Sequence, residues 1–339
     1  ARVDKGVGYV HAEVDKLLQK GRISPDAANR TQALVSGSVS KEAFADADFV
    51  IEAVFEELNV KKQVFKEVEA IVSPECILAT NTSSLSVTAM AEDLEHPERL
   101  VGFHFFNPVA VMPLLEIVRA PKTDDAVLAT AFELAKGLKK SAVLVKDAAA
   151  FVVNRLLLRL MGEVTAAFDE GTPAEVADNA LRPMGLPMTP FTLGAMVGLP
   201  VAQHVQESLH AAFGDRFTVS RNLQALIDNG VRSLWDPASV KAGKPVIPAE
   251  TLALMSFGDS PSTADEVLRR TQDALAEEIG LMLAEGVVAG PEDIDLCMIL
   301  GAGWPMFLGG ITPYLDRVGA SERVNGKKFL APGVASEPA

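Results

Sequence analysis

Residues 48–80 read DFVIEAVFEELNVKKQVFKEVEAIVSPECILAT and carry the pattern that is most diagnostic of the fold. The stretch opens with an apolar run at Asp48–Val54 and closes with a second one at Cys76–Thr80. Between them, from Leu58 to Val72, apolar residues recur at helical spacing with lysines in between. Short apolar runs separated by an amphipathic helix are typical of a strand–helix–strand unit in a largely parallel α/β sheet.

The same alternation continues toward the C-terminus as far as Lys146 and then stops. Further strands are expected at Leu100–Phe106, Leu114–Val118 and Ala142–Val145, with helices up to Lys20, at Val87–Ala91 and at Asp124–Leu138. From Ala148 onward the apolar spacing is that of long helices. We therefore expect an α/β part, a truncated Rossmann-type parallel sheet in residues 1–147, followed by an all-α part.

The all-α part contains an internal repeat. Asn154-Arg155, Glu163 and Glu170-Gly171 align with Arg269-Arg270, Glu278 and Glu285-Gly286, and Gly185-Leu186-Pro187-Met188 aligns with Gly303-Trp304-Pro305-Met306. The repeat predicts two related helical modules, residues 148–234 and residues 263–339, with chance similarity between helices as the alternative. Residues 235–262 are rich in Pro, Gly and Ser and are expected to form a loop or linker.

Composition excludes several classes of protein. The chain has 339 residues, 48% of them hydrophobic, and a formal net charge of −14, which argues against a general nucleic-acid or anionic-membrane binder. Cys76 and Cys297 are isolated, so we expect no disulfide framework, no metal site and a reducing cytoplasm. The sequence contains no apolar run near the roughly 18 residues of a spanning helix, so no integral membrane contact is expected.

One histidine has a carboxylate partner on a neighbouring apolar segment. His104 lies in GFHFFNP, residues 102–108, and Glu116 lies in LLEIV, residues 114–118. If these segments lie side by side, the carboxylate accepts one ring N–H and makes the other nitrogen a usable base near neutral pH. The alternative is a core histidine whose hydrogen bonds are satisfied at the end of a strand.

Two further polar positions are candidates for substrate or cofactor binding. Residues 81–84, Asn-Thr-Ser-Ser, follow the Cys76–Thr80 strand, where open α/β sheets bind their ligands. The alternative is that Ser84 or Ser86 caps the next helix. Asn154 lies among large apolar residues near the start of a long helix, and its alternative role is a buried amide that ties two helices together.

The glycine-rich turn of a dinucleotide site is not recognisable in the sequence. Gly6-Val7-Gly8 is followed by His11 at the third glycine position and has no preceding strand, and Gly301-Ala302-Gly303 has Met306 at that position. Neither is taken as a nucleotide-binding loop. The chain opens with a helical stretch up to Lys20, as though it began after a strand–helix–strand start.

Taken together, the motifs resemble the L-3-hydroxyacyl-CoA dehydrogenase family. They are Ile51–Glu56 with Lys61, Asn81–Ser84, His104–Pro108, Glu116 and Phe151–Arg155, in the order and spacing of the family. The duplicated helical module resembles the long form in the α subunit of bacterial fatty-acid oxidation multienzymes. That resemblance implies NAD as cofactor, an acyl-CoA substrate, and compatibility with a thiolase subunit in a multienzyme complex or with a homo-oligomer.

The resemblance also implies a role for each site residue. His104 would take the proton of the 3-hydroxyl group, Glu116 would orient His104, and Ser83 and Asn154 would bind the substrate oxygens. Glu56, Lys61, Asn81 and Asn107 would contact NAD. The chain departs from the family pattern in lacking the glycine-rich turn, the acidic residue after the second strand and an upstream enoyl-CoA hydratase domain. We therefore expect these residues to be part of a longer protein, and a fragment of this extent to bind NAD poorly or not at all.

Two other functions remain open. One is a non-catalytic module for acyl-CoA docking and assembly. The other is a Rossmann dehydrogenase of the 3-hydroxyisobutyrate or 6-phosphogluconate type, which expects a catalytic lysine in the first helix after the sheet. Asn154 occupies the corresponding polar position here and disfavours that type.

Overall fold

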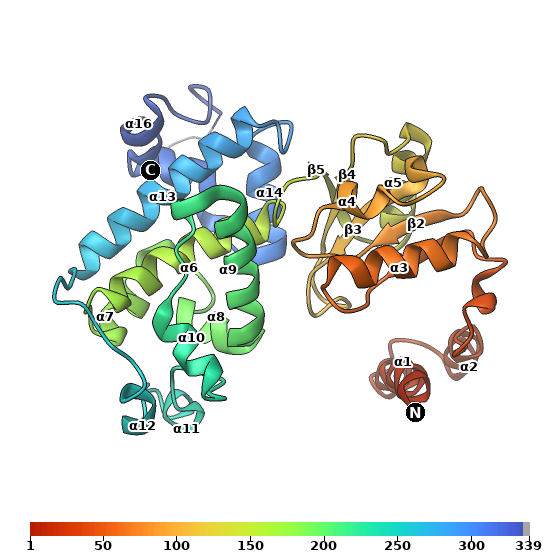
Figure 1. The fold of residues 1–339 in the computed structure, drawn as a ribbon, viewed down its shortest axis with the longest axis horizontal. Helices are drawn as coiled ribbons and strands as arrows, with labels where there is room; N and C mark the ends of the chain where they lie inside the picture. The colour runs from red at the N-terminus through yellow and green to blue at the C-terminus, as the bar shows by residue number, and fades with distance from the viewer. Residues whose placement is uncertain (335–339) are drawn as a thin grey trace.

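A computed structural model describes residues 1–334; the last five residues of the second predicted module, 335–339, lie outside the described residues. A five-stranded sheet in the order β1-β2-β3-β4-β5 forms the N-terminal part (Figure 1). Its strands are β1 (Phe49–Glu52), β2 (Ile77–Thr80), β3 (Leu100–Phe105), β4 (Leu114–Arg119) and β5 (Ser141–Lys146). The predicted strands and the largely parallel sheet are confirmed.

One pair of strands departs from the parallel arrangement. β3 and β4 are antiparallel, whereas β1–β2, β2–β3 and β4–β5 are parallel. The connection from Phe106 to Pro113 is a short loop without a helix. Parallel neighbours need a crossover of about a dozen residues or more, so a connection of this length reverses the chain direction.

The two faces of the sheet are covered by different helices. α5 (Asp125–Gly137) covers one face through Val127, Leu128 and Ala131. On the other face, α3 (Leu58–Glu69) packs on β1 and α4 (Val87–Ala91) packs on β3, while α14 (Pro291–Ala302) from the C-terminal part packs on β4 and β5. The sheet and the helical part thus share one apolar core.

The N-terminal residues form a helical hairpin that lies apart from the sheet, on the side of α3 (Figure 1). α1 (Arg2–Gln19) and α2 (Pro25–Ala33) pack on each other, and Ser24 caps α2 by accepting a hydrogen bond from the Ala27 N–H. The predicted helix up to Lys20 is therefore present. Short 3-10 turns follow at Lys41–Phe44 (η1) and Pro97–Arg99 (η2).

The C-terminal part is helical, as predicted, and is built around two long helices, α6 (Val153–Asp169) and α13 (Ala264–Ala284), which pack on each other. The other helices are α7 (Ala174–Asn179), α8 (Pro190–Val197), α9 (Leu199–Phe213), α10 (Arg221–Asp228), α11 (Pro237–Lys241), α12 (Ala249–Leu252), α15 (Ile311–Arg317) and α16 (Ala320–Asn325), with 3-10 turns η3 (Arg182–Met184), η4 (Gly214–Arg216) and η5 (Met306–Leu308). The segment expected to be a loop or linker contains α11 and α12. It is anchored by Trp235, whose buried indole N–H donates to Asp178.

Aligned residues of the internal repeat contact each other reciprocally. An arginine of each copy binds two glutamates of the other copy. Arg155 binds Glu278 and Glu285, and Arg270 binds Glu163 and Glu170, all at 2.6 to 3.3 Å. Each contact in one direction has its counterpart in the other, as in the self-complementary interface of a two-fold dimer.

A buried aspartate supports the start of one helix of the second copy. Asp295 accepts hydrogen bonds from the Thr312 N–H at 2.8 Å and the Thr312 hydroxyl at 2.7 Å, at the N-terminus of α15. Burial raises the pKa of Asp295 from 3.8 to about 6; the Thr312 bonds oppose this rise and the nearby Asp316 adds to it. The folded protein therefore binds this proton more tightly than the unfolded chain does.

Replacing Asp295 by asparagine is expected to change the pH dependence of stability. The pKa of Asp295 is higher in the folded protein than in the unfolded chain, so the proton on Asp295 stabilises the folded protein fully below about pH 4. This stabilisation is lost as the pH rises through about 6. The asparagine variant lacks this proton. As the pH rises from 4 to 7, its free energy of unfolding should therefore increase relative to that of wild type by up to about 3 kcal/mol. Urea unfolding at a series of pH values measures this difference, and a difference that stays constant across the window contradicts the assignment.

Candidate active site

His104 and Glu116 face each other across the antiparallel strands β3 and β4. They are directly opposed in the register, and His104 Nδ1 lies 2.7 Å from Glu116 Oε2. Both side chains are buried. An ionised carboxylate only accepts hydrogen bonds, so Nδ1 carries the proton toward Glu116 and Nε2 is left as the basic nitrogen.

The second carboxylate oxygen of Glu116 lies at the N-terminus of α6. Oε1 accepts hydrogen bonds from the backbone N–H groups of Val152 at 3.2 Å and Val153 at 3.1 Å. The chain reaches this position through Ala150 and Phe151, whose φ angles of 58° and 53° fall in the left-handed region that non-glycine residues seldom adopt. The free N–H groups at a helix N-terminus bind acceptor oxygens, so the start of α6 holds the Glu116 carboxylate in place.

Two aromatic rings flank the imidazole of His104. The ring centroid of Phe106 lies 4.5 Å away and that of Phe151 lies 5.6 Å away. These rings cover the imidazole, which is only 4% exposed. They restrict water at the His104–Glu116 pair and strengthen its hydrogen bond.

The loop after β2 is held in place by Glu56. Glu56 Oε1 accepts hydrogen bonds from the Thr82 hydroxyl at 2.6 Å and from the Ser83 and Ser84 N–H groups at 2.8 and 3.2 Å. Burial alone would raise the pKa of Glu56, but these hydrogen bonds and nearby Lys61 lower it more, so the pKa lies below its usual value. Glu56 thereby fixes the backbone that carries Ser83. The capping alternative is borne out for Ser86, whose hydroxyl accepts the Ala89 N–H, and not for Ser84.

Lys61 forms a buried ion pair directly beneath this loop. Its Nζ lies 2.8 Å from Glu52 Oε1 and 3.2 Å from Glu56 Oε2, and its side chain is 1% exposed. Glu52 also accepts a hydrogen bond from the Thr80 hydroxyl at 2.7 Å. The ammonium group of Lys61 therefore connects Glu52, at the end of β1, to Glu56, which holds the loop after β2.

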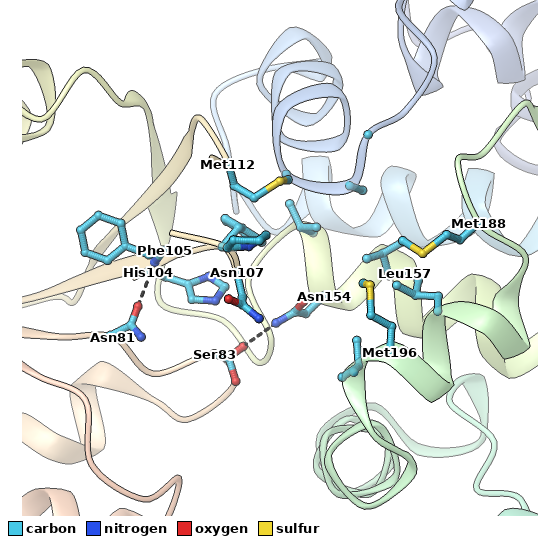
Figure 2. Close-up of a pocket in the computed structure, with 18 of the residues that line it drawn as sticks. Asn81, Ser83, His104, Phe105, Asn107, Met112, Asn154, Leu157, Met188 and Met196 are labelled. Atoms are coloured by element: carbon cyan, nitrogen blue, oxygen red, sulfur yellow. Dashed lines mark hydrogen bonds between the residues drawn. The ribbon is translucent and has the colours of Figure 1, made fainter. Parts of the chain in front are cut away.

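Two amides join these elements around the cavity. Asn81 Oδ1 accepts a hydrogen bond from the Phe105 N–H at 2.9 Å, and Asn154 Nδ2 donates to the Ser83 carbonyl oxygen at 3.2 Å (Figure 2). Asn154 thus ties α6 to the loop after β2, whereas the sequence alternative was a bond between two helices. The polar groups that follow β1, β2 and β3 meet at the edge where parallel strands end.

A cavity of about 890 Å³ lies between this edge of the sheet and the helical part. Seven of the eight residues chosen from the sequence line it. They are Glu56, Lys61, Asn81, Ser83, His104, Asn107 and Asn154. Glu116 does not line it and lies behind His104, in the position of a residue that orients the imidazole. The described residues contain no group of His, Cys, Asp and Glu side chains that could hold a metal ion.

Several residues around the cavity were not singled out from the sequence. Glu52 and Thr80 stabilise Lys61, and the Val152 and Val153 N–H groups bind Glu116. Gly301–Gly303 line the cavity from the end of α14, and Gly6–Gly8 lie within α1. Neither glycine run forms a strand-to-helix turn, in agreement with the sequence interpretation.

Replacing Glu116 by glutamine is expected to lower kcat about 10- to 100-fold while the protein stays folded. The amide cannot balance the positive charge that His104 gains when it takes a proton. We expect kcat to fall more than KM rises, since Glu116 does not line the cavity. Steady-state kinetics with thermal unfolding as a fold check measure this, and Glu98→Gln, in the exposed His96–Glu98 pair, is the matched control. Wild-type kcat in Glu116→Gln would remove the carboxylate from the mechanism.

A largely parallel sheet with a His–Glu pair and a cavity at its strand ends, closed by a helical part, defines a Rossmann-type protein with its ligand site at that edge of the sheet. Residues 1–148 match the family model described as 3-hydroxyacyl-CoA dehydrogenase, NAD binding domain, and residues 151–233 match the C-terminal domain of the same family. The chain belongs to the 3-hydroxyacyl-CoA dehydrogenase family.

Individual relatives agree with this assignment. The fatty acid oxidation complex subunit alpha of Idiomarina loihiensis is 35% identical over 329 residues, which is 95% of this chain and 46% of that protein. The crystal structure of (S)-3-hydroxybutyryl-CoA dehydrogenase from Ralstonia eutropha is 32% identical, covers 68% of this chain and 83% of its own, and superimposes with a TM-score of 0.64. 3-Hydroxybutyryl-CoA dehydrogenase from Escherichia coli, at 24% identity and a TM-score of 0.77, covers 98% of this chain and 89% of its own and shares the fold. The chain spans about half the length of the curated relatives it matches.

Proposed function

We propose that the protein oxidises (S)-3-hydroxyacyl-CoA to 3-oxoacyl-CoA with NAD, as in fatty-acid β-oxidation. The observation that carries this proposal is the His104–Glu116 pair, in which a helix-capped carboxylate orients an imidazole at the wall of a large cavity. Oxidation of an alcohol requires a base for the hydroxyl proton, and an oriented histidine is the most common base at neutral pH.

His104 Nε2 accepts the proton of the 3-hydroxyl group as the C3–H bond breaks and the carbonyl forms. When bound, NAD supplies the acceptor for the hydride that leaves C3. Glu116 accepts the hydrogen bond from the Nδ1–H group of His104 throughout the reaction and balances the charge of the imidazolium. In the reverse direction, His104 returns the proton to the carbonyl oxygen. General acid–base assistance of this kind is worth about 10²- to 10⁴-fold.

Ser83 and Asn154 bind the oxygen atoms of the substrate in this proposal. The Asn154 amide donates one N–H to the Ser83 carbonyl group, which fixes its orientation and leaves its second N–H for the substrate. The Ser83 hydroxyl lies 3.3 Å from Glu56. Both residues line the cavity with His104, so one thioester substrate can contact all three.

The residues on the sheet side of the cavity fit the nicotinamide half of NAD. Asn81 and Asn107 provide amide groups. The ion pair of Lys61 and Glu56 provides charged groups, and the apolar residues Ala53 and Val54 line the same cavity. These residue types suit a carboxamide and a ribose. We assign Glu56, Lys61, Asn81 and Asn107 to cofactor binding on this basis, with Glu56 acting also through the loop at Ser83.

We also propose the domain division at residues 1–147, 148–234, 235–262 and 263–339. The reciprocal Arg–Glu pairs between α6 and α13 support two related modules, the second of which stands where a partner copy would. The relatives' name, fatty acid oxidation complex subunit alpha, supports membership of a multienzyme complex, for which we propose a thiolase subunit as partner. Two buried free cysteines, Cys76 and Cys297, support a reducing compartment such as the cytoplasm.

Reduction of acetoacetyl-CoA by NADH tests the proposal, with the full-length protein as the enzyme and loss of NADH absorbance as the readout. We expect turnover with the thioester and none with free acetoacetate. An acyl-CoA docking module would bind acetoacetyl-CoA in calorimetry without oxidising NADH. A dehydrogenase of the alternative types would oxidise 3-hydroxyisobutyrate or 6-phosphogluconate and leave the thioester unchanged.

A further inference from the structure

The end of α14 forms one wall of the cavity, although α14 belongs to the second copy of the internal repeat. Gly301, Ala302 and Gly303 line the same cavity as His104. The helix reaches this place because it packs on β4, β5 and α6. Both helical copies therefore close the cavity, and the first copy alone would leave it open on this side.

Glycine at position 301 allows α14 to come this close. A Cβ atom there would lie 2.6 Å from Leu114 Cδ2 and 2.9 Å from Val153 Cγ2, well inside the distance at which packed carbons repel. Gly303 ends the helix with φ of 71°, and a Cβ atom there would lie 3.2 Å from Pro187 Cγ. The half-buried methyl group of Ala302, between these two contacts, is the only side chain of this three-residue wall.

The apolar part of the cavity lies on the helical side. Figure 2 shows Leu157, Met188 and Met196 beyond Asn154 as seen from His104. Methionine side chains are unbranched and adapt to the shape of an apolar ligand. With the 3-hydroxyl group of the substrate at His104, the methylene groups that extend from C3 would run between these side chains and the end of α14.

We propose that Ala302 determines how long an acyl chain the active site accepts, so that the second helical module is a specificity-determining part of the site. This inference rests on the proposed function, because the reaction at His104 fixes the position of C3, from which the acyl chain extends. A methyl group at this wall leaves room for a longer chain. Each methylene group buried in the cavity should raise kcat/KM about fourfold until the space is filled.

The test compares 3-oxoacyl-CoA substrates of four and ten carbons in the NADH assay. The variants are Ala302→Leu, Ala302→Val and the matched control Ala284→Leu, which places the same side chain on an exposed residue at the end of α13. Calorimetric binding of butyryl-CoA and decanoyl-CoA, measured without NADH, is the second readout. Thermal unfolding checks the fold of each variant.

We expect wild type and Ala284→Leu to prefer the ten-carbon substrate. In Ala302→Leu the ten-to-four ratio of kcat/KM should fall about 10- to 60-fold, the equivalent of two to three buried methylene groups. Ala302→Val should show a smaller fall in the same direction and replaces the leucine variant if that one does not fold. Equal ratios in wild type and the position 302 variants would overturn the inference.

The outcomes also separate this inference from the proposed function. If wild type reduces no thioester, the proposed function fails. The ratio of the affinities for decanoyl-CoA and butyryl-CoA, compared between wild type and Ala302→Leu, then still tests the role of Ala302. A ratio that falls in Ala302→Leu supports the role of Ala302, and an unchanged ratio overturns it. If thioesters are reduced with the same chain-length preference in all variants, the function stands and the role of Ala302 is wrong.

Discussion

Replacement of His104 by glutamine is expected to lower kcat for the reduction of acetoacetyl-CoA by NADH about 10²- to 10⁴-fold. An amide can still donate a hydrogen bond to Glu116, whose second oxygen stays bound to the α6 N-terminus. It can neither give nor take the proton that the substrate oxygen exchanges. The loss should therefore appear in kcat, with KM and the unfolding temperature close to those of wild type.

His96→Gln is the matched control for this variant. His96 also pairs with a glutamate, Glu98 at 3.1 Å, but its side chain is 51% exposed and it does not line the cavity. The same substitution there should leave kcat unchanged, because no reacting group lies nearby. If His104→Gln keeps kcat within a few-fold of wild type, the base is another group and the proposed chemistry at this pair is wrong.

The strands that carry the pair could be predicted, because β3 and β4 are apolar runs apart from His104, Glu116 and the terminal Arg119. The sequence did not predict that these two strands are neighbours in the sheet. The loop between Phe105 and Leu114 has no helix, and that makes the two strands antiparallel neighbours. The register, which decides whether the imidazole and carboxylate meet, depends on packing on both faces of the sheet and has no local signal.

The support behind Glu116 could not be predicted. This support depends on left-handed backbone conformations at Ala150 and Phe151. Neither alanine nor phenylalanine is a residue type that favours this conformation, so the sequence does not indicate a turn here. These angles turn the first N–H groups of α6 toward a carboxylate that lies 36 residues earlier in the chain. Such strain persists only when the surrounding core holds it, and that core becomes visible only with the structure.

Lys61 and Gly301 illustrate the same limit in different ways. A lysine at helical spacing normally indicates a solvated face, but Lys61 is buried because Glu52 lies beneath it at the end of β1. Gly301 was considered only as part of a nucleotide-binding turn. Its actual requirement is the close approach of α14 to Leu114 and Val153, which no short-range pattern contains.

Replacement of Arg155 by methionine is expected to lower the free energy of unfolding by about 2 to 3 kcal/mol. Arg155 and Glu278 are both fully buried, with Arg155 Nε 2.6 Å from Glu278 Oε1, and the guanidinium also binds Glu285 at 2.8 Å. Methionine keeps the apolar contact of the side chain with the Phe213 ring, over which the guanidinium lies at 4.2 Å. Glu278 keeps Arg216, whose Nη1 lies 3.1 Å from its Oε2. The loss therefore reports the removal of the Arg155 ion pairs with Glu278 and Glu285, and urea unfolding measures it.

The internal repeat supplies the matched control. Arg270 makes the reciprocal contacts with Glu163 and Glu170, but its side chain is 34% exposed and that of Glu170 is 41% exposed. Arg270→Met should therefore cost no more than about 1 kcal/mol, as solvent screens the charges that remain. The double variant Arg155→Met/Glu278→Leu should recover only part of the loss, because Arg216 then loses its ion pair with Glu278. Equal losses in Arg155→Met and Arg270→Met would contradict this account, since burial is what distinguishes the two otherwise equivalent positions.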